Sequence, residues 1–362
     1  RVTLDDYSQQ YAYLAREAQN CGRPTAVLYR NNDSALPLVD LLERKGIPYV
    51  CRQREGFFFT SPVVRDLTDI LGFAQAPYDR ARFLNFYYKL GLKIKKETLT
   101  GLLSRQREGE TVFETLLGGG LSGWQAGRVK AMQTHFSKLP QLSSFAALQR
   151  IVKYMGYGDY LKEQKMDTAR LDVLLALAAQ TKEQGAFLRR LEDLRTLTTE
   201  GGRSGGDAPF VLSTIHASKG LEYDRVLLID GAAGVFPAVR EGVPSSTEGR
   251  EAMEEERRLF YVGATRAREE LVLLTYANKF GEPVEGGFPF VDQLLEEEAA
   301  SGGGTEGYGP GTELIHNKFG RGYLQSLAGG IAVIAFEGAG VKKVDLNACL
   351  RKGLVRRREP PV

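Results

Sequence analysis

The sequence has few cysteines and histidines, and their positions exclude several kinds of site. Its three cysteines, Cys21, Cys51 and Cys349, lie far apart and lack metal-ligand spacing. They indicate neither a disulfide framework nor a zinc site, and they fit a reducing, cytoplasmic location. The three histidines are scattered, so they predict neither a metal site nor a Ser/His/Asp hydrolase triad.

Long apolar runs and an excess of one charge are also lacking. The longest apolar run, Val173–Ala179, is far shorter than the roughly 18 residues that a membrane-spanning helix needs. We therefore predict a soluble protein with no membrane partner. Lys and Arg total 48 against 45 Asp and Glu, so any basic surface must be local. A chain of 362 residues with 43% hydrophobic content can bury the cores of two or three domains.

The sequence contains no G-x-x-x-x-G-K-[ST] motif, whose backbone amides and lysine hold the phosphates of a nucleoside triphosphate. By itself, the chain is therefore expected to lack a triphosphate site. It opens with Arg1 and shows no signal-peptide pattern, so we expect a fragment or a processed product.

Short β-type runs alternate with helical segments near both ends of the first 295 residues. The runs are Thr25–Tyr29, Ile47–Cys51, Val211–Thr214, Arg225–Asp230 and Leu271–Thr275. The expected helices are 8–20, 34–45 with Ser34 as N-cap and Gly46 after its end, 61–74 and 251–267. This alternation predicts a parallel sheet with right-handed crossovers.

Helical periodicity replaces this alternation in the middle of the chain, most clearly at 99–105, 124–139, 145–154 and 171–197. With a Gly-rich joint at 201–206, it predicts an α-helical domain (76–206) inserted into an α/β domain (1–75 and 207–295). After a linker (296–309), short runs at 312–316, 322–327, 331–336 and 341–344 predict a small SH3- or Tudor-like β-barrel with a basic tail at 351–358, together spanning 310–362.

Polar residues follow the run that ends at Thr214. His216, Lys219 and Glu222 lie in the turn after it. Donors at the carboxyl end of a parallel strand suit phosphate or nucleic-acid backbone. The alternative is that His216 is structural or simply exposed and that Glu222 only pairs with Lys219.

Arg266 ends the helix expected at 251–267. Leu259, Val262 and Ala264 form an apolar face that should hold this helix against the sheet. A rigidly placed guanidinium matches phosphate oxygens and suits a developing phosphoryl charge. An arginine at a helix carboxyl end also complements the helix dipole, which is the ordinary alternative.

The segment 80–107 is the basic part of the chain. Its eight Lys and Arg and one Glu give a local charge of +7, and Phe83, Phe86, Tyr87 and Tyr88 are interleaved with them. Basic residues beside aromatic ones suit a nucleic acid. Alternatively, the aromatic residues are core and the charges form a solvated face.

Taken together, these residues resemble the carboxyl-terminal half of superfamily 1 DNA helicases of the UvrD/Rep/PcrA type. STIHASKGLEYDRVLLIDGAAGVFP (213–237) resembles the fifth helicase motif, and EEERRLFYVGATRARE (254–269) resembles the sixth. AVLYRNNDSALPLVDLLERKGIPY (26–49) is similar to the strand–helix–strand after the fourth motif, and 311–346 to the Tudor-like domain. GLKIKKETL (91–99) is similar to a helix-hairpin-helix-like duplex contact, with Ile94 in place of its second glycine.

The resemblance implies roles for particular residues. Arg266 would contact the γ-phosphate of ATP, Gly220 and Glu222 would face the nucleotide, and Tyr261 and Arg258 would support the helix. The residues implied to contact DNA are Arg30, Asn31, Thr214, His216, Lys93, Lys95 and Lys96. The first RecA-like domain, which carries the phosphate loop and the Mg²⁺-binding motif, is not in this chain, nor is the arginine of the fourth motif.

We therefore expect a RecA-like α/β domain, a helical insert and a Tudor-like barrel from an ATP- and Mg²⁺-dependent DNA helicase moving 3′ to 5′ in repair or replication. Its partners would be single-stranded DNA and the single/double-strand junction, the missing RecA-like domain, and RNA polymerase or repair proteins at the barrel. The alternative function is a stand-alone module that binds nucleic acid or RNA polymerase without motor activity.

Overall fold

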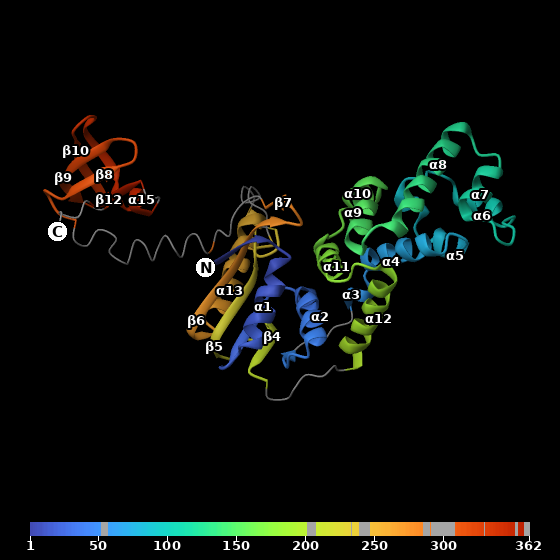
Figure 1. The fold of residues 1–362 in the computed structure, drawn as a ribbon, viewed down its shortest axis with the longest axis horizontal. Coiled ribbons are helices and arrows are strands. Elements are labelled where there is room, and N and C mark those ends of the chain that lie inside the picture. The colour runs from blue at the N-terminus through green and yellow to red at the C-terminus, as the bar shows by residue number, and fades with distance from the viewer. Residues whose placement is uncertain are drawn as a thin grey trace. The chain divides into compact units, whose positions relative to one another are not determined.

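The computed structural model describes residues 1–51, 57–200, 208–232, 234–238, 247–284, 290, 308–328, 330–351 and 354–357. The chain divides into two compact units, residues 1–288 and 289–362 (Figure 1). The predicted joint at 201–206 and residues 296–307 of the predicted linker lie outside the described residues. The division of the first unit into an α/β domain and an inserted domain stays a prediction.

A largely parallel sheet forms one part of the first unit, in the order β1-β6-β5-β2-β4-β3, with β7 antiparallel to β6. The strands are β1 (Val2–Asp6), β2 (Thr25–Tyr29), β3 (Val50–Cys51), β4 (Phe210–Thr214), β5 (Tyr223–Gly231), β6 (Ala267–Lys279) and β7 (Glu282–Pro283). Every residue of β2 and of β4 is buried, as expected for central parallel strands. The predicted parallel sheet is confirmed. Prediction missed β1, because its half-buried, alternating edge pattern contains no continuous apolar run.

Three helices lie alongside these strands in Figure 1, namely α1 (Gln9–Gln19), α2 (Leu36–Lys45) and α13 (Thr247–Ala264). Gly46 ends α2 in the left-handed conformation at φ 63°, as predicted. The predicted cap by Ser34 is wrong, because α2 starts at Leu36 after the 3₁₀ turn η1 (Asn32–Ala35) and its N-cap residue has no side-chain cap. The Ser34 hydroxyl instead hydrogen-bonds the buried Asp230 carboxyl group, which needs a partner.

Helices make up the rest of the first unit. They are α3 (Phe57–Thr60), α4 (Pro62–Gln75), α5 (Arg80–Leu84), α6 (Lys96–Leu103), α7 (Val112–Gly118), α8 (Gly123–Lys138), α9 (Ser144–Tyr154), α10 (Tyr157–Glu163), α11 (Ala169–Ala179) and α12 (Gln184–Glu200), with 3₁₀ turns η2 (Tyr87–Leu90) and η3 (Leu139–Gln141). The prediction of one helix at 171–197 is wrong. The chain turns between α11 and α12, where the Lys182 carbonyl accepts a hydrogen bond from the Ser144 amide at 2.8 Å. Periodicity does not show such a tertiary contact.

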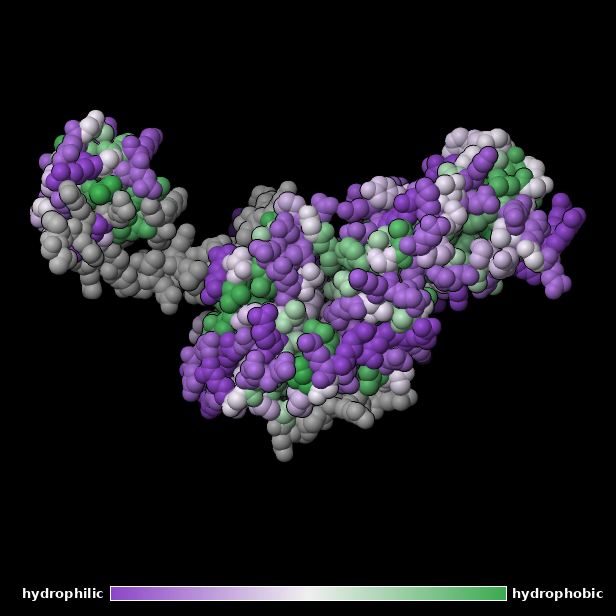
Figure 2. Space-filling view, viewed as in Figure 1, coloured by the Kyte–Doolittle hydropathy of each residue, from purple (hydrophilic) through white to green (hydrophobic). Residues whose placement is uncertain are grey.

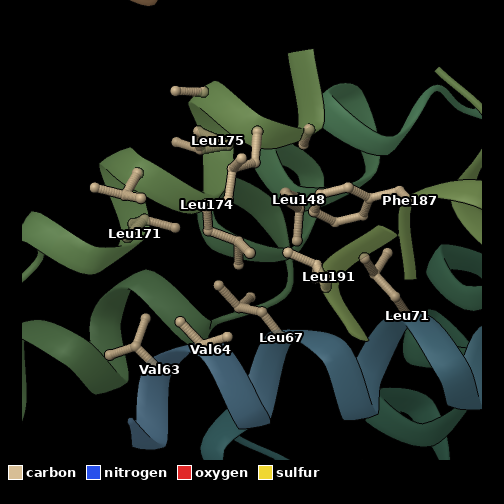
Figure 3. Packing of buried hydrophobic residues seen from close by; sticks show 14 of the residues in the cluster. Val63, Val64, Leu67, Leu71, Leu148, Leu171, Leu174, Leu175, Phe187 and Leu191 are labelled. Atoms are coloured by element: carbon tan, nitrogen blue, oxygen red, sulfur yellow. The ribbon is translucent and has the colours of Figure 1, made fainter. Parts of the chain in front are cut away.

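The core of this helical segment is aliphatic. Leu67 and Leu71, one turn apart on α4, face Leu174 of α11, Leu148 of α9 and Leu191 of α12 (Figure 3). All five side chains are buried, and burying one such side chain contributes about 1.5–3 kcal/mol. Helix α4 is thereby fixed to α9, α11 and α12.

Most aromatic residues of the basic segment 80–107 belong to the core. Phe83 and Phe86 are fully buried, and Tyr87 is 5% exposed. Lys89 is also buried and pairs with Asp66 at 2.5 Å. The alternative that these aromatics are core is therefore confirmed for the three of them.

The second unit is a five-stranded antiparallel sheet in the order β11-β10-β9-β8-β12. Its elements are β8 (Glu313–His316), β9 (Gly320–Ala328), β10 (Ile331–Phe336), β11 (Gly340–Asp345), α15 (Leu346–Arg351) and β12 (Val355–Arg357). The four predicted strands are confirmed. The prediction of a basic tail at 351–358 is wrong in part, because β12 pairs with β8 and Val355 is buried. The sequence pattern did not indicate this strand, because Val355 is its only apolar residue and its other two residues are arginines.

No helix in the described ranges is both long and apolar enough to cross a bilayer. Hydrophilic side chains cover much of the face shown in Figure 2, and hydrophobic ones are scattered among them.

Candidate functional site

Strands β2 and β4 bring four of the predicted site residues to one edge of the sheet. The two strands are parallel neighbours, with Tyr29 opposite Thr214, and the Ile215 amide donates to the Tyr29 carbonyl at 2.9 Å. Residues that follow these strands therefore share the carboxyl edge of the sheet. Thr214 is 5% exposed and its Oγ1 accepts from the Ala217 amide at 3.2 Å, whereas His216 is exposed.

A cleft of about 1330 Å³ opens at this edge, and Arg30, Asn31, Thr214 and His216 all line it. Residues of α9 and α11 also line the cleft, together with Phe57, which is 65% exposed. The structure thus brings the four predicted residues of the sheet edge into one cavity. The lining also includes residues outside the segment predicted as an insert, among them Asp33, Lys279 and Glu282.

Ion pairs connect the sheet with the helical segment around the cleft. Arg170 of α11 pairs with Asp33 at 2.8 Å, and Lys153 of α9 pairs with Glu282 of β7 at 2.8 Å. Asp172 of α11 pairs with Lys279 of β6; burial raises the pKa of the Asp172 carboxyl group, and Lys279 opposes that effect. Sequence reasoning missed these pairs because their members are more than 100 residues apart.

The Arg30 side chain is bound to a buried carboxylate. Its Nε donates to both carboxylate oxygens of Glu256, at 2.8 and 3.0 Å, and its Nη1 donates to Asn31 Oδ1 at 3.0 Å. Glu256 is 5% exposed, lies on α13 and also accepts from the Ala238 amide at 3.1 Å. Direct DNA contact by Arg30 stays a prediction. The observed role of its side chain is to join the carboxyl edge of the sheet to α13.

Arg266 lies at the opposite, amino edge of the sheet, immediately before β6. Its guanidinium donates to the carbonyls of Val262 at 2.9 Å and Leu221 at 3.2 Å, and to Thr265 Oγ1 at 2.9 Å. The Arg266 carbonyl accepts from the Tyr223 amide at 2.9 Å. The structure thereby brings Arg266 beside the segment that holds the predicted nucleotide-facing residues.

Those two residues lie at the surface. Glu222 is exposed. Gly220 has φ 83°, and no heavy atom stands within 4 Å of the place a Cβ would take. A ligand could therefore approach the backbone closely at Gly220.

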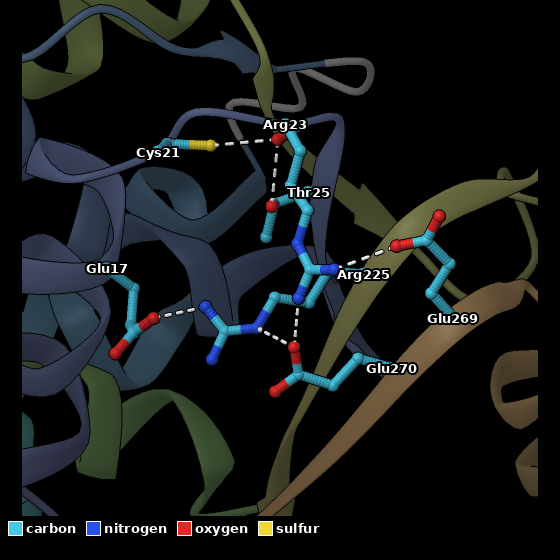
Figure 4. Close-up of polar contacts among 7 residues, drawn as sticks. All are labelled: Glu17, Cys21, Arg23, Thr25, Arg225, Glu269 and Glu270. Carbon is cyan, nitrogen blue, oxygen red and sulfur yellow. Dashed lines mark hydrogen bonds and ion pairs between the residues drawn. The ribbon is translucent and has the colours of Figure 1, made fainter.

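Neighbouring arginines at the amino edge are neutralised by carboxylates. Arg23 pairs with Glu269 and Glu270, Arg225 pairs with Glu17 and Glu270, and Arg268 pairs with Asp224 (Figure 4 shows the first two). Arg266 forms no ion pair with any carboxylate of the described residues. It is a half-buried cation whose geometry is fixed by neutral acceptors.

The buried stripe of α13 differs from the predicted one. Leu259, Phe260 and Gly263 are buried, whereas Val262 and Ala264 are only half-buried. A Cβ on Gly263 would stand 3.3 Å from Leu228 Cδ1 of β5, so glycine permits this close helix–strand approach. The expected supporting residues project into solvent, since Tyr261 is 68% exposed and Arg258 is exposed. These two side chains therefore do not pack against the sheet, and the support predicted for them stays a prediction; Arg258 pairs with Glu254 one turn earlier on α13.

The three lysines Lys93, Lys95 and Lys96, the loop lysines, are exposed and do not line the cleft. Within the described part of the chain, no group of three or more His, Cys, Asp or Glu side chains is placed to hold a metal ion.

Comparison of the sequence with known proteins found a matching family model and several similar proteins. Residues 128–279 match the family model described as the UvrD-like helicase C-terminal domain. The chain is 26% identical over 279 residues to the putative ATP-dependent DNA helicase YjcD of Bacillus subtilis, covering 74% of this chain and 36% of that protein. It is 28% identical over 285 residues to the ATP-dependent DNA helicase Rep of Escherichia coli, covering 72% and 41%.

DNA helicase II of Escherichia coli is 27% identical over 367 residues, covering 88% of this chain and 50% of that protein. The chain thus spans 36% to 50% of the length of these three relatives. Its residues 128–279 are thus similar to the UvrD-like helicase C-terminal domain, and the chain is similar to a carboxyl-terminal part of UvrD/Rep/PcrA-type DNA helicases.

Proposed function

We propose that this chain is the carboxyl-terminal portion of a cytoplasmic ATP-dependent DNA helicase that couples ATP hydrolysis to 3′-to-5′ movement along a single strand and to duplex unwinding in DNA repair or replication. The parallel sheet would be the second RecA-like domain, and the five-stranded unit would be a Tudor-like barrel. Similarity to proteins named as DNA helicases supports the class of activity.

The main observation behind the proposal is that the Arg266 guanidinium is held in place without being neutralised. Two backbone carbonyls and a hydroxyl orient it, and no carboxylate of the described residues neutralises it. Such a group can meet the oxygens of a γ-phosphate without first breaking an ion pair. Arg23, Arg225 and Arg268, at the same edge, would have to break one.

ATP, when bound, supplies the free energy of phosphoryl transfer. Arg266 would bind its γ-phosphate, Glu222 would accept from a hydroxyl or water, and the open backbone at Gly220 would lie against the nucleotide. The described residues contain no group of three or more metal-binding side chains to which Mg²⁺ could be assigned. We assign the ligands of Mg²⁺ and the phosphate loop to the RecA-like domain that is absent from this chain.

Helix α13 would couple the two edges of the sheet. Glu256, bound to Arg30 beside the cleft, and Arg266 at the amino edge are ten positions apart, which is about 15 Å along a helix. A shift of Arg266 toward phosphate would move α13 and, through Arg30, the wall of the cleft. Thr214 and His216 would then move with the strand they bind.

The test is ATP turnover by the full-length protein with Arg266→Ala. Turnover should fall about 10³-fold or more, while binding of single-stranded DNA stays close to wild type. The matched control is Arg257→Ala, which removes an exposed arginine of the same helix that pairs with Glu254. Wild-type turnover in Arg266→Ala, or an equal loss in Arg257→Ala, would overturn the proposal.

The remaining partners are proposed on the same resemblance. The second unit would contact RNA polymerase or repair proteins, and the loop lysines would contact DNA at a single/double-strand junction.

The stand-alone binding module is the second candidate, favoured by the lack of a phosphate-loop motif in these 362 residues. DNA-dependent ATP turnover by the full-length protein separates it from the helicase.

A further inference from the structure

A buried carboxyl group, that of Asp230, joins three elements beside the cleft. Asp230 lies near the end of β5 and is 1% exposed. Gln10 of α1 is fully buried, and its Nε2 donates to Asp230 Oδ1 at 2.9 Å. The hydroxyl of Ser34, a residue of η1 that lines the cleft, also hydrogen-bonds the carboxyl group. Asp230 therefore connects β5 with α1 and with the 3₁₀ turn at the cleft.

Two oxygen atoms of this contact lack a donor. Asp230 Oδ2 and Gln10 Oε1 are both buried, and neither has a hydrogen-bond partner within the described part of the chain. Each shares its carbon with an atom of the 2.9 Å hydrogen bond, so the two groups already face each other. Both oxygens are only acceptors when Asp230 is ionised, and unpaired buried acceptors are rare because they are costly.

A single proton would satisfy both atoms. Placed on Asp230 Oδ2, it turns that oxygen into a donor, and the new hydroxyl can donate to Gln10 Oε1. Gln10 Nε2 keeps its hydrogen bond to Oδ1. The two side chains then form a cyclic acid–amide pair with one hydrogen bond in each direction.

The charges around Asp230 also favour the neutral acid. The titratable groups that interact with it electrostatically are Tyr7, Tyr11 of α1, Asp172 of α11, and Tyr276 and Lys279 of β6. Lys279 is the only cation among them, and it already pairs with Asp172. An ionised Asp230 would therefore leave one negative charge uncompensated. Burial raises the pKa of the Asp230 carboxyl group, although Ser34, Gln10 and Lys279 oppose this.

We propose that Asp230 is a proton-binding site, in which Oδ2 carries a proton donated to Gln10 Oε1 and the neutral acid leaves Lys279 bound to Asp172. The Lys279–Asp172 pair joins β6 to α11, and both residues line the cleft. Loss of the proton offers Lys279 a second carboxylate and so weakens its contact with α11. By linkage, the contact and the proton stabilise each other. This inference is independent of the ligand that the cleft binds.

The experiment compares infrared spectra of the wild-type chain and Asp230→Asn at about pH 5, roughly one unit above the ordinary pKa of aspartate. The carbonyl stretch of a protonated carboxyl group is separate from the carboxylate bands. The difference spectrum should contain this stretch, and raising the pH should convert it into carboxylate bands. Asp5→Asn, at an exposed position, is the matched control and should remove mainly carboxylate bands. Carbon-13 labelling of aspartate in the wild-type chain identifies the same stretch without a variant.

Lys279→Met tests the coupling to α11. It removes the cation that favours the ionised form, so the protonated band of Asp230 should persist to higher pH. The band is isolated by comparing Lys279→Met with Lys279→Met/Asp230→Asn. Lys153→Met removes another lysine beside the cleft, paired with Glu282, and should leave this titration unchanged. Thermal unfolding followed by circular dichroism checks that each variant is folded.

Two results would overturn the inference. If no protonated band is present at about pH 5, Asp230 is ionised there, and a water that donates to Asp230 Oδ2 and Gln10 Oε1 replaces the proton. If the titration is the same in Lys279→Met and wild type, the proton is not coupled to the Lys279–Asp172 pair.

Discussion

Arg30 and Glu256 form a bidentate ion pair that joins the carboxyl end of β2 to the middle of α13. Glu256 is buried, and its other contact, from the Ala238 amide, leaves the guanidinium as its only charged partner among the described residues. The pair therefore fixes α13, which ends beside Arg266, to the residues that line the cleft.

Arg30→Met should destabilise the protein by about 2–3 kcal/mol, because it leaves Glu256 as a buried carboxylate without its cation. This value is below the usual cost of breaking a buried pair, since the Arg30 side chain is 31% exposed. The double variant Arg30→Met/Glu256→Met should recover most of the stability, because apolar residues of similar volume often replace a buried pair without loss. Urea unfolding of the three proteins measures both effects.

The double variant also separates stability from coupling. In the full-length protein it should keep basal ATP turnover but lose most of the stimulation by DNA, because α13 is no longer joined to the cleft. Stimulation at the wild-type level in a stable double variant would show that the ion pair only stabilises the fold.

Asp230→Asn should become relatively more stabilising as pH rises. Asp230 is fully buried, and burial raises the pKa of its carboxyl group above 3.8, although hydrogen bonds from Ser34 and Gln10 oppose this. The native state then keeps a proton that the unfolded state has lost. Wild-type stability therefore falls as pH rises from about 4 through the raised native pKa. An asparagine accepts the same hydrogen bonds, tolerates φ 64° and does not titrate.

The measurement is urea unfolding of both proteins at about pH 4 and about pH 7. The difference between variant and wild type should shift toward the variant at the higher pH. Asp5→Asn, at an exposed position, is the control and should show no such shift. A difference that does not change with pH would show that Asp230 titrates alike in both states.

Local sequence patterns predicted the central strands, the end of α2 at Gly46 and the position of α13. Burial and turn geometry determine which residue types occur within a few positions of one another, so short patterns are enough to indicate them. They did not predict which cations are neutralised. Glu256 reads as one of three consecutive glutamates, and only the packing of α13 on the sheet makes it the buried partner of Arg30. Sequence reasoning also missed the contact between Gln10 and Asp230, because the two residues are 220 positions apart.

The Arg170–Asp33 pair beside the cleft leads to two predictions of opposite sign for DNA binding. Arg170→Ala removes a cation and should weaken binding of single-stranded DNA. The slope of log affinity against log salt concentration should also become less steep, by about the amount that one phosphate contact contributes. Asp33→Asn removes the carboxylate with which a phosphate would compete for Arg170, at 2.8 Å in the free protein. It should therefore tighten binding and steepen the salt dependence. Anisotropy titrations at several salt concentrations measure both slopes, and weakening of similar size in the two variants would show that the pair orders the cleft instead of supplying a contact to DNA.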